Sequence, residues 1–145
     1  MITQHPALNR VIFFGENMKT IIAGSRNFKK YDLIEQVVED VIKRGINITE
    51  VVSGGARGVD TMGETWAVKK GVNVKRYPAE WNKYGLSAGP IRNRQMGNYA
   101  DALIAIWDGT SSGTKNMIDY AKEKNLLVFV YIVKQNGEWH AVVNN

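Results

Sequence analysis

The sequence contains no cysteine, and its two histidines, His5 and His140, stand near opposite ends of a chain of 145 residues. The absence of cysteine excludes a disulfide scaffold, a thiolate zinc site and a cysteine nucleophile. The separation of the histidines argues against a histidine-rich metal site. We therefore predict no metal centre.

Long apolar runs and a leader pattern are also missing. No run approaches the ~18 apolar residues that a membrane-spanning helix needs. The opening residues, MITQHPALNR, do not combine a basic start with an apolar stretch, as a secretory signal would. We therefore expect a cytoplasmic protein with no membrane contact.

The composition that remains is that of a folded domain. Hydrophobic residues make up 44% of the chain and charged residues 23%, which excludes a disordered chain. The length fits a single domain with a proper core. The net charge of +5 permits an anionic ligand or nucleic acid without demanding either.

Apolar runs and helical periodicities alternate along the chain. Strands are predicted at residues 20–23, 48–52, 72–77, 102–107 and 127–133, and helices at 32–44, 58–70, 90–99 and 112–125. Asn136-Gly137 predicts a hairpin turn into a last strand at 139–143. Strands separated by helices of this length form parallel sheets with right-handed crossovers.

The predicted fold is therefore an α/β, Rossmann-like three-layer sandwich. We expect a mostly parallel sheet of order 3-2-1-4-5, helices on both faces and a C-terminal β-hairpin. Residues 18–145 form one predicted domain, and residues 1–17 an N-terminal extension in which residues 11–14 are a candidate edge strand.

In such folds ligands bind beyond the carboxyl ends of the strands, at the switch point between the first and fourth strands. The loop Gly24-Ser25-Arg26 follows the first strand directly. Gly24 lets the backbone approach a ligand, Ser25 offers a hydroxyl, and Arg26 can bind phosphate or carboxylate in a bidentate manner. The alternative is a plain tight turn with a surface arginine, and we favour the ligand site.

The loop after the second strand contains two adjacent glycines and leads into a helix. Glycines and free amides at a helix start form a cradle for an anion or for ribose. Asp60 can accept a hydrogen bond from a ribose hydroxyl or merely complement the helix dipole. The spacing is not GxGxxG, which disfavours NAD. The candidate ligand residues here are Ser53, Gly54, Gly55, Ala56, Gly58 and Asp60.

The loop after the fourth strand is the strongest phosphate-site candidate. Its hydroxyl residues and glycines precede a helix whose first amides point outward. It lacks the spacing of a Walker loop, and the alternative is a helix capped by serine or threonine. The candidate residues are Asp108, Gly109, Thr110, Ser111, Ser112, Gly113 and Thr114.

The fourth loop, residues 88–94, starts the third predicted helix and carries two arginines. Arg92 and Arg94 are two residues apart, so they point to different sides of a helix. We favour Arg92 as the pocket residue, against the alternative of a solvated basic turn. Trp81 and Tyr84, just upstream, can cover or stack on a base.

These motifs together resemble a known family. GSR-x-F, SGGARGVD, PAEWxxYGxxAGPIRNRQM and ADALIAIWDGTSSGT are similar to the SLOG superfamily, and most of all to its YspA/YpsA-related branch, common in bacteria and phages. The resemblance implies a Rossmann-like fold that binds a nucleotide or nucleotide-derived ligand, in a homodimer or higher homo-oligomer. For a phage-encoded member it implies the host cytoplasm.

The LOG phosphoribohydrolases, which release a base from cytokinin-type nucleoside monophosphates, are better-known members of this superfamily. Arg92 and Met96 match their Arg-Lys-x-x-Met helix start, and Gly113 and Thr114 match their later Gly-Thr. The position of their catalytic glutamate is Met117, which cannot act as an acid, a base or a cation stabiliser. The sequence therefore departs from LOG-type hydrolysis.

Any catalysis would need another carboxylate, because no Ser-His-Asp set, metal cluster or carboxylate dyad stands out. Asp60, Asp108 or Glu80 can substitute in principle, and the catalytic candidates are Asp60, Arg92 and Asp108. We predict no separate cofactor, and a binding protein in preference to an enzyme.

SGGARGVD and Arg92-Asn93-Arg94 are also similar to DprA proteins, which bind single-stranded DNA. The basic residues are spread along this chain, whereas DNA binding favours a denser stripe. We therefore predict a sensor or sequestering module for a nucleotide or nucleotide-derived ligand. The alternatives are a nucleotide hydrolase that cleaves an N-glycosidic bond and a binder of single-stranded nucleic acid.

Overall fold

The computed structural model describes residues 2–5, 10–13 and 15–142, and its main feature is a six-stranded sheet. The strand order is β5-β4-β3-β6-β7-β8, with parallel neighbours except for the antiparallel pair β7 and β8. The predicted order and C-terminal hairpin are confirmed. The strands are β3 (Glu16–Gly24), β4 (Ile46–Ser53), β5 (Asn73–Arg76), β6 (Ala102–Trp107), β7 (Leu127–Val133) and β8 (Trp139–Ala141).

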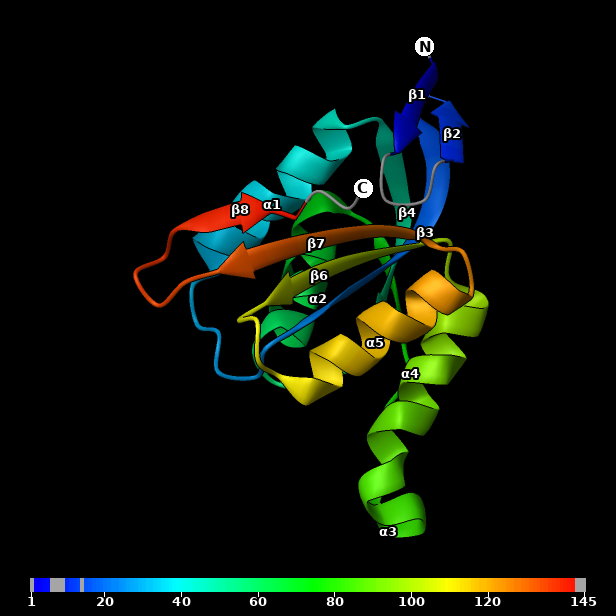
Figure 1. Cartoon of the computed structure of the whole chain (residues 1–145), viewed down its shortest axis with the longest axis vertical. Helices are drawn as coiled ribbons and strands as arrows, with labels where there is room; N and C mark the ends of the chain where they lie inside the picture. The colour runs from blue at the N-terminus through cyan, green and yellow to red at the C-terminus, as the bar shows by residue number, and fades with distance from the viewer. Residues whose placement is uncertain (1, 6–9, 14, 143–145) are drawn as a thin grey trace.

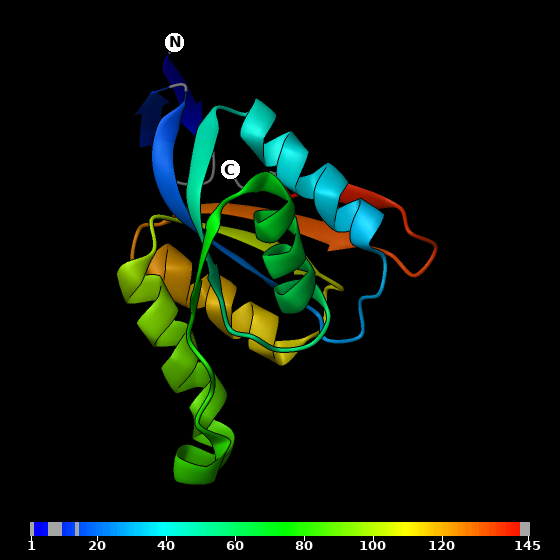
Figure 2. The same ribbon diagram turned by 180° about the vertical axis from the view of Figure 1, so that it is seen from behind.

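Helices cover both faces of the sheet and complete three layers (Figures 1 and 2). One pair of helices, α1 and α2, lies on one face, and the pair α4 and α5 lies on the other. The helices are α1 (Tyr31–Lys43), α2 (Val59–Lys70), α4 (Ala88–Tyr99) and α5 (Ser112–Glu123).

The core follows from the sequence patterns of these elements. The apolar spacing of α1 places Ile34, Val37, Val38 and Val41 against the sheet, where all four are fully buried. The central strand β6 is buried from Ala102 to Ile106 because helices cover it on both sides. Double coverage is why its sequence is a continuous apolar run instead of an alternation.

Two segments differ from the sequence-based expectation. The first strand of the sheet is longer than residues 20–23, because β3 begins at Glu16, opposite Ile46 of β4. The segment 78–89, expected as a loop, contains the short helix α3 (Trp81–Tyr84), a 3-10 turn η1 (Gly85–Ser87) and the first turn of α4. The segment is rich in glycine, proline and other small residues, which predict turns instead of a helix. Together these elements form an arm that projects beyond the sheet (Figure 1).

The N-terminal segment does not extend the edge of the main sheet. Strands β1 (Ile2–His5) and β2 (Arg10–Phe13) pair with each other as a separate antiparallel sheet. Residue 14 of the candidate edge strand and residue 143 of the last predicted strand lie outside the described residues. Within the described ranges, no helix combines the length and apolarity required to cross a membrane.

A glycine fixes how closely the ends of the two central strands approach. A Cβ at Gly24 would overlap the carbonyl oxygen of Ile106 and lie 2.8 Å from Val59 Cγ2. We predict that Gly24→Ala lowers the free energy of unfolding by about 2 kcal/mol or more, because backbone must move to admit the methyl group. Urea denaturation measures this difference.

Gly113→Ala is the matched control, because a Cβ there meets open space in the first turn of α5. Its stability should equal or exceed that of the wild type by up to about 1 kcal/mol. Equal stability of the two variants would show that the close approach at Gly24 is not a constraint.

Candidate ligand-binding site

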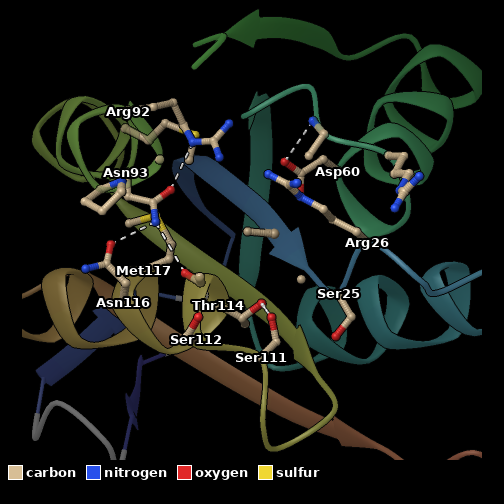
Figure 3. Close-up of a pocket in the computed structure, with 18 of the residues that line it drawn as sticks. Ser25, Arg26, Asp60, Arg92, Asn93, Ser111, Ser112, Thr114, Asn116 and Met117 are labelled. Atoms are coloured by element: carbon tan, nitrogen blue, oxygen red, sulfur yellow. Dashed lines mark hydrogen bonds between the residues drawn. The ribbon is translucent and has the colours of Figure 1, made fainter. Parts of the chain in front are cut away.

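A cavity of about 800 Å³ opens at the carboxyl ends of β3 and β6 (Figure 3). These strands are neighbours, and the helices that follow them lie on opposite faces of the sheet. A crevice forms at such a switch point because the two chain connections diverge. Its volume is within the usual range for small-molecule sites.

Twelve of the residues predicted from the sequence line this cavity. They are Gly24, Ser25, Arg26, Ala56, Asp60, Trp81, Arg92, Asp108, Ser111, Ser112, Gly113 and Thr114. The lining does not include Ser53, Gly54, Gly55, Gly58, Gly109 or Thr110. It does include several residues that sequence reasoning did not select, namely Ala23, Asn27, Arg57, Leu86, Gly89, Pro90, Asn93, Met96, Asn116 and Met117.

Two glycines of the second loop shape the wall from behind. A Cβ at Gly54 would clash with the Arg92 guanidinium and lie 2.8 Å from Asp60 Oδ2. Gly58 has a φ of +83°, and a Cβ there would clash with the carbonyl of Ser25. These glycines therefore allow charged side chains and a neighbouring loop to approach the backbone.

Ser53 supports the second loop from below. Its buried hydroxyl donates to Glu64 Oε2 at 2.6 Å and accepts from the Gly55 amide at 3.0 Å. Glu64 in turn pairs with Arg76. These bonds hold Ser53 beneath the cavity.

The N-terminus of α5 presents unpaired amides to the cavity. The first helical hydrogen bond runs from the Lys115 amide to the Ser111 carbonyl, so the amides of residues 112–114 precede any intrahelical acceptor. Ser111, at the N-cap, makes no side-chain cap. This weighs against the alternative of a serine-capped helix and leaves these donors available to an anion.

Asp108 organises the loop before this helix. Its Oδ1 accepts from the amides of Thr110 at 2.9 Å and Ser111 at 2.7 Å. Burial raises the pKa of Asp108, but these amide bonds outweigh it, so the pKa lies below its ordinary value. A carboxylate engaged in this way shapes the loop and is poorly suited to proton transfer.

Arg92 is a buried cation in the wall of the cavity, with 9% of its surface exposed. Its Nη1 donates to the Gly54 carbonyl at 2.7 Å, and its Nε donates to Asn93 Oδ1 at 3.1 Å. Burial lowers the pKa of Arg92, the charge of Arg26 lowers it further, and Asp60 opposes both. The two guanidinium groups therefore repel each other at the cavity.

Asp60 is the buried carboxylate that faces Arg92. Burial raises its pKa to about 6, against the opposing effects of Arg92 and of the Ala56 and Gly24 amides. The Ala56 amide lies 3.3 Å from its Oδ2. Asp60 can therefore accept a hydrogen bond when ionised and donate one when protonated.

Asn93, which sequence reasoning missed, joins α4 to the phosphate-site candidate. Its Nδ2 donates to Asn116 Oδ1 at 2.9 Å and to the Gly113 carbonyl at 3.3 Å (Figure 3). The available signal was its position beside Arg92 at the start of a helix. Asn93 lies between two arginines, and charged residues are the stronger sequence signal for an anion site.

Comparison with known proteins identifies the family. The profile described as "YspA, cpYpsA-related SLOG family" matches residues 18–84. The Gene 61 protein of Mycobacterium phage D29 is 32% identical over 116 residues, which cover 76% of this chain and 93% of that protein. This chain belongs to the YspA, cpYpsA-related SLOG family. The family resemblance predicted from the sequence motifs is confirmed.

A solved structure supports the fold of this SLOG chain. DNA processing protein A (DprA) from Streptococcus pneumoniae superposes with a TM-score of 0.59 at 18% identity. The match covers 81% of this chain and 50% of DprA, so the SLOG chain spans about half the length of that protein. At this identity the likeness shows a shared fold.

The buried Asp60 carboxylate should make stability depend on pH. Its pKa, about 6 in the folded chain, lies above the ordinary 3.8. The folded state therefore holds this proton more tightly, and stability falls as the pH rises from about 4 through about 6. Asp60→Asn stays neutral at every pH. Its free energy of unfolding should exceed that of the wild type by about 2 to 3 kcal/mol at about pH 8 and equal it near pH 4.

Urea denaturation of both proteins across this pH range measures the difference. Asp119→Asn is the control, because Asp119 is exposed on α5 and forms a surface ion pair with Lys115. If the difference in free energy of unfolding between Asp60→Asn and wild type were the same at all pH values, the raised pKa of Asp60 would be contradicted.

Proposed function

We propose that this protein binds a nucleotide or nucleotide-derived ligand in the cavity, as a sensor or sequestering module. The observation that carries the proposal is the convergence of the unpaired α5 amides with the cations Arg26 and Arg92 around one cavity. Amides at a helix start and guanidinium groups both favour phosphate. An anion between them would also relieve the repulsion between the arginines.

The phosphate group fits best at residues 112–114. The Thr114 hydroxyl, buried at the cavity wall and 3.4 Å from Ser111 Oγ, adds a further donor beside the amides. Each charge-assisted hydrogen bond contributes about 1.5–3 kcal/mol. A few such bonds support micromolar affinity, after the cost of association.

The ribose fits beside Asp60, on the wall opposite α5 (Figure 3). An ionised Asp60 can accept hydrogen bonds from ribose hydroxyls. Of the second loop, Ala56 and Arg57 reach the cavity, so this loop contributes fewer ligand contacts than its glycines suggested.

A binding role is favoured over hydrolysis by the residue at the LOG glutamate position. Met117 occupies that position, is buried and lines the cavity. Its thioether has no acid or base chemistry. The remaining carboxylates are Asp60, paired electrostatically with Arg92, and Asp108, engaged by its own loop.

A single-residue change tests the phosphate position. Ser112→Pro deletes one amide donor at the first position of α5, where proline is favoured, and the preceding Ser111 has the extended backbone that proline requires (φ −57°, ψ 119°). We expect about tenfold weaker binding of AMP by calorimetry with an unchanged melting temperature. Ser112→Ala, which keeps the amide, is the control. Equal affinities for the two variants would place the phosphate elsewhere.

A ligand panel tests the function itself. Nucleoside monophosphates, cyclic and dinucleotide signals and ADP-ribose are added separately, and each mixture is then analysed by chromatography. A ligand at 100 times its dissociation constant should stabilise the fold by about 2.7 kcal/mol and remain intact. Released base or phosphate would establish an enzyme. If no ligand stabilised the fold, the proposal would be contradicted, and a nucleic acid or a protein partner would be favoured.

A further inference from the structure

The mouth of the cavity carries an aromatic side chain that the fold leaves partly in solvent. Trp81 of α3 lines the cavity with 46% of its surface exposed, whereas Trp66 is fully packed in the core. Leu86, on the same arm, is 93% exposed and also lines the cavity. Large apolar groups at the rim of a cavity are typical of a ligand contact surface.

The position of Trp81 is set by its neighbours on two elements. Its Cη2 atom reaches Gly89 in the first turn of α4, where an added Cβ would lie 3.4 Å from it. The Arg26 guanidinium carbon lies over the indole ring, 5.6 Å from its centroid. Arg26 is exposed and makes no hydrogen bond or ion pair with any residue in the described ranges.

The contact between Arg26 and Trp81 is easily exchanged. A solvent-exposed cation–π pair is weak, and the charge of Arg26 is also repelled by Arg92. A nucleobase offers the indole a larger flat surface at closer range than a guanidinium does. When an anion is bound at α5, the displaced guanidinium has a charged partner within the same cavity.

We propose that the Trp81 face is the platform for the base of the bound nucleotide, and that Arg26 covers this face in the free protein. The base slides between the two side chains, the indole stacks on one side of it, and Arg26 moves onto the ligand. The platform selects a heteroaromatic base and favours purines over pyrimidines, because a bicyclic base overlaps more of the indole. This inference rests on the proposed nucleotide site.

The test compares ligands that differ only in the base. AMP, GMP, CMP and UMP are titrated against ribose 5-phosphate, which carries the same sugar and phosphate, and affinities are measured by calorimetry. Wild-type protein should bind AMP and GMP at least about tenfold more tightly than ribose 5-phosphate, as one stacked base contributes. CMP and UMP should lie between them.

Trp81→Ala should remove the preference for the nucleoside monophosphates over ribose 5-phosphate and leave the affinity for ribose 5-phosphate unchanged. Trp81→Phe keeps a smaller ring and should retain part of this preference. Tyr84→Ala is the matched control, because Tyr84 is an exposed aromatic residue of the same short helix and is not among the residues that line the cavity.

Three outcomes would overturn the inference while leaving the nucleotide site standing. They are equal wild-type affinities for AMP and ribose 5-phosphate, an equal loss for both ligands in Trp81→Ala, and an unchanged preference for AMP in Trp81→Ala. Failure of the wild-type protein to bind any of these phosphates would instead contradict the proposed function, and the base platform with it.

Discussion

A guanidinium group that is almost fully buried must find acceptors and a compensating charge, and the site is built around this requirement at Arg92. Its hydrogen bonds go to the Gly54 carbonyl after β4 and to Asn93 on its own helix, and Asp60 of α2 supplies the charge. Removal of one of these hydrogen-bond acceptors is costly, because the donor stays buried without a partner. The packing of α4 is therefore tied to the position of the second loop.

The same arrangement leaves an electrostatic imbalance that a ligand can correct. Arg26 and Arg92 repel each other, while burial raises the pKa of the Asp60 carboxylate, so that it is more easily protonated than an exposed aspartate. The α5 amides add further positive potential. The anionic ligand that we propose would balance the positive charge of the two arginines and the α5 amides. A phosphate would therefore meet a region of positive potential in this cavity.

Sequence patterns predicted the fold well because each pattern had one physical cause. The continuous apolar run of β6 is typical of a strand covered on both faces, and the one-sided apolar spacing of α1 is typical of a helix that packs against a sheet. Loops rich in glycine and serine follow the carboxyl ends of the strands, where ligands bind in such folds, and so indicated the cavity. The arm was harder to predict, because a short helix such as α3 buries none of its residues and leaves no periodicity.

Individual roles within the loops could not be read from the sequence. Ser53 and Ser112 are both serines at strand or helix ends, but Ser53 bonds to Glu64 beneath the cavity while Ser112 lines it. Gly54 and Gly58 were predicted to contact a ligand, and the structure adds that they make room for Arg92 and Ser25. Such assignments depend on contacts between segments far apart in the chain, such as the bond from Asn93 to Gly113.

We propose that the phosphate of the ligand sits on the first turn of α5. An NMR titration of isotopically labelled protein with AMP tests it most directly, because backbone amide signals report each donor separately. The account predicts that the amides of Ser112, Gly113 and Thr114 shift most, together with the side-chain Nε signal of Arg92. Shifts confined to other amides, with these three unchanged at saturation, would contradict it.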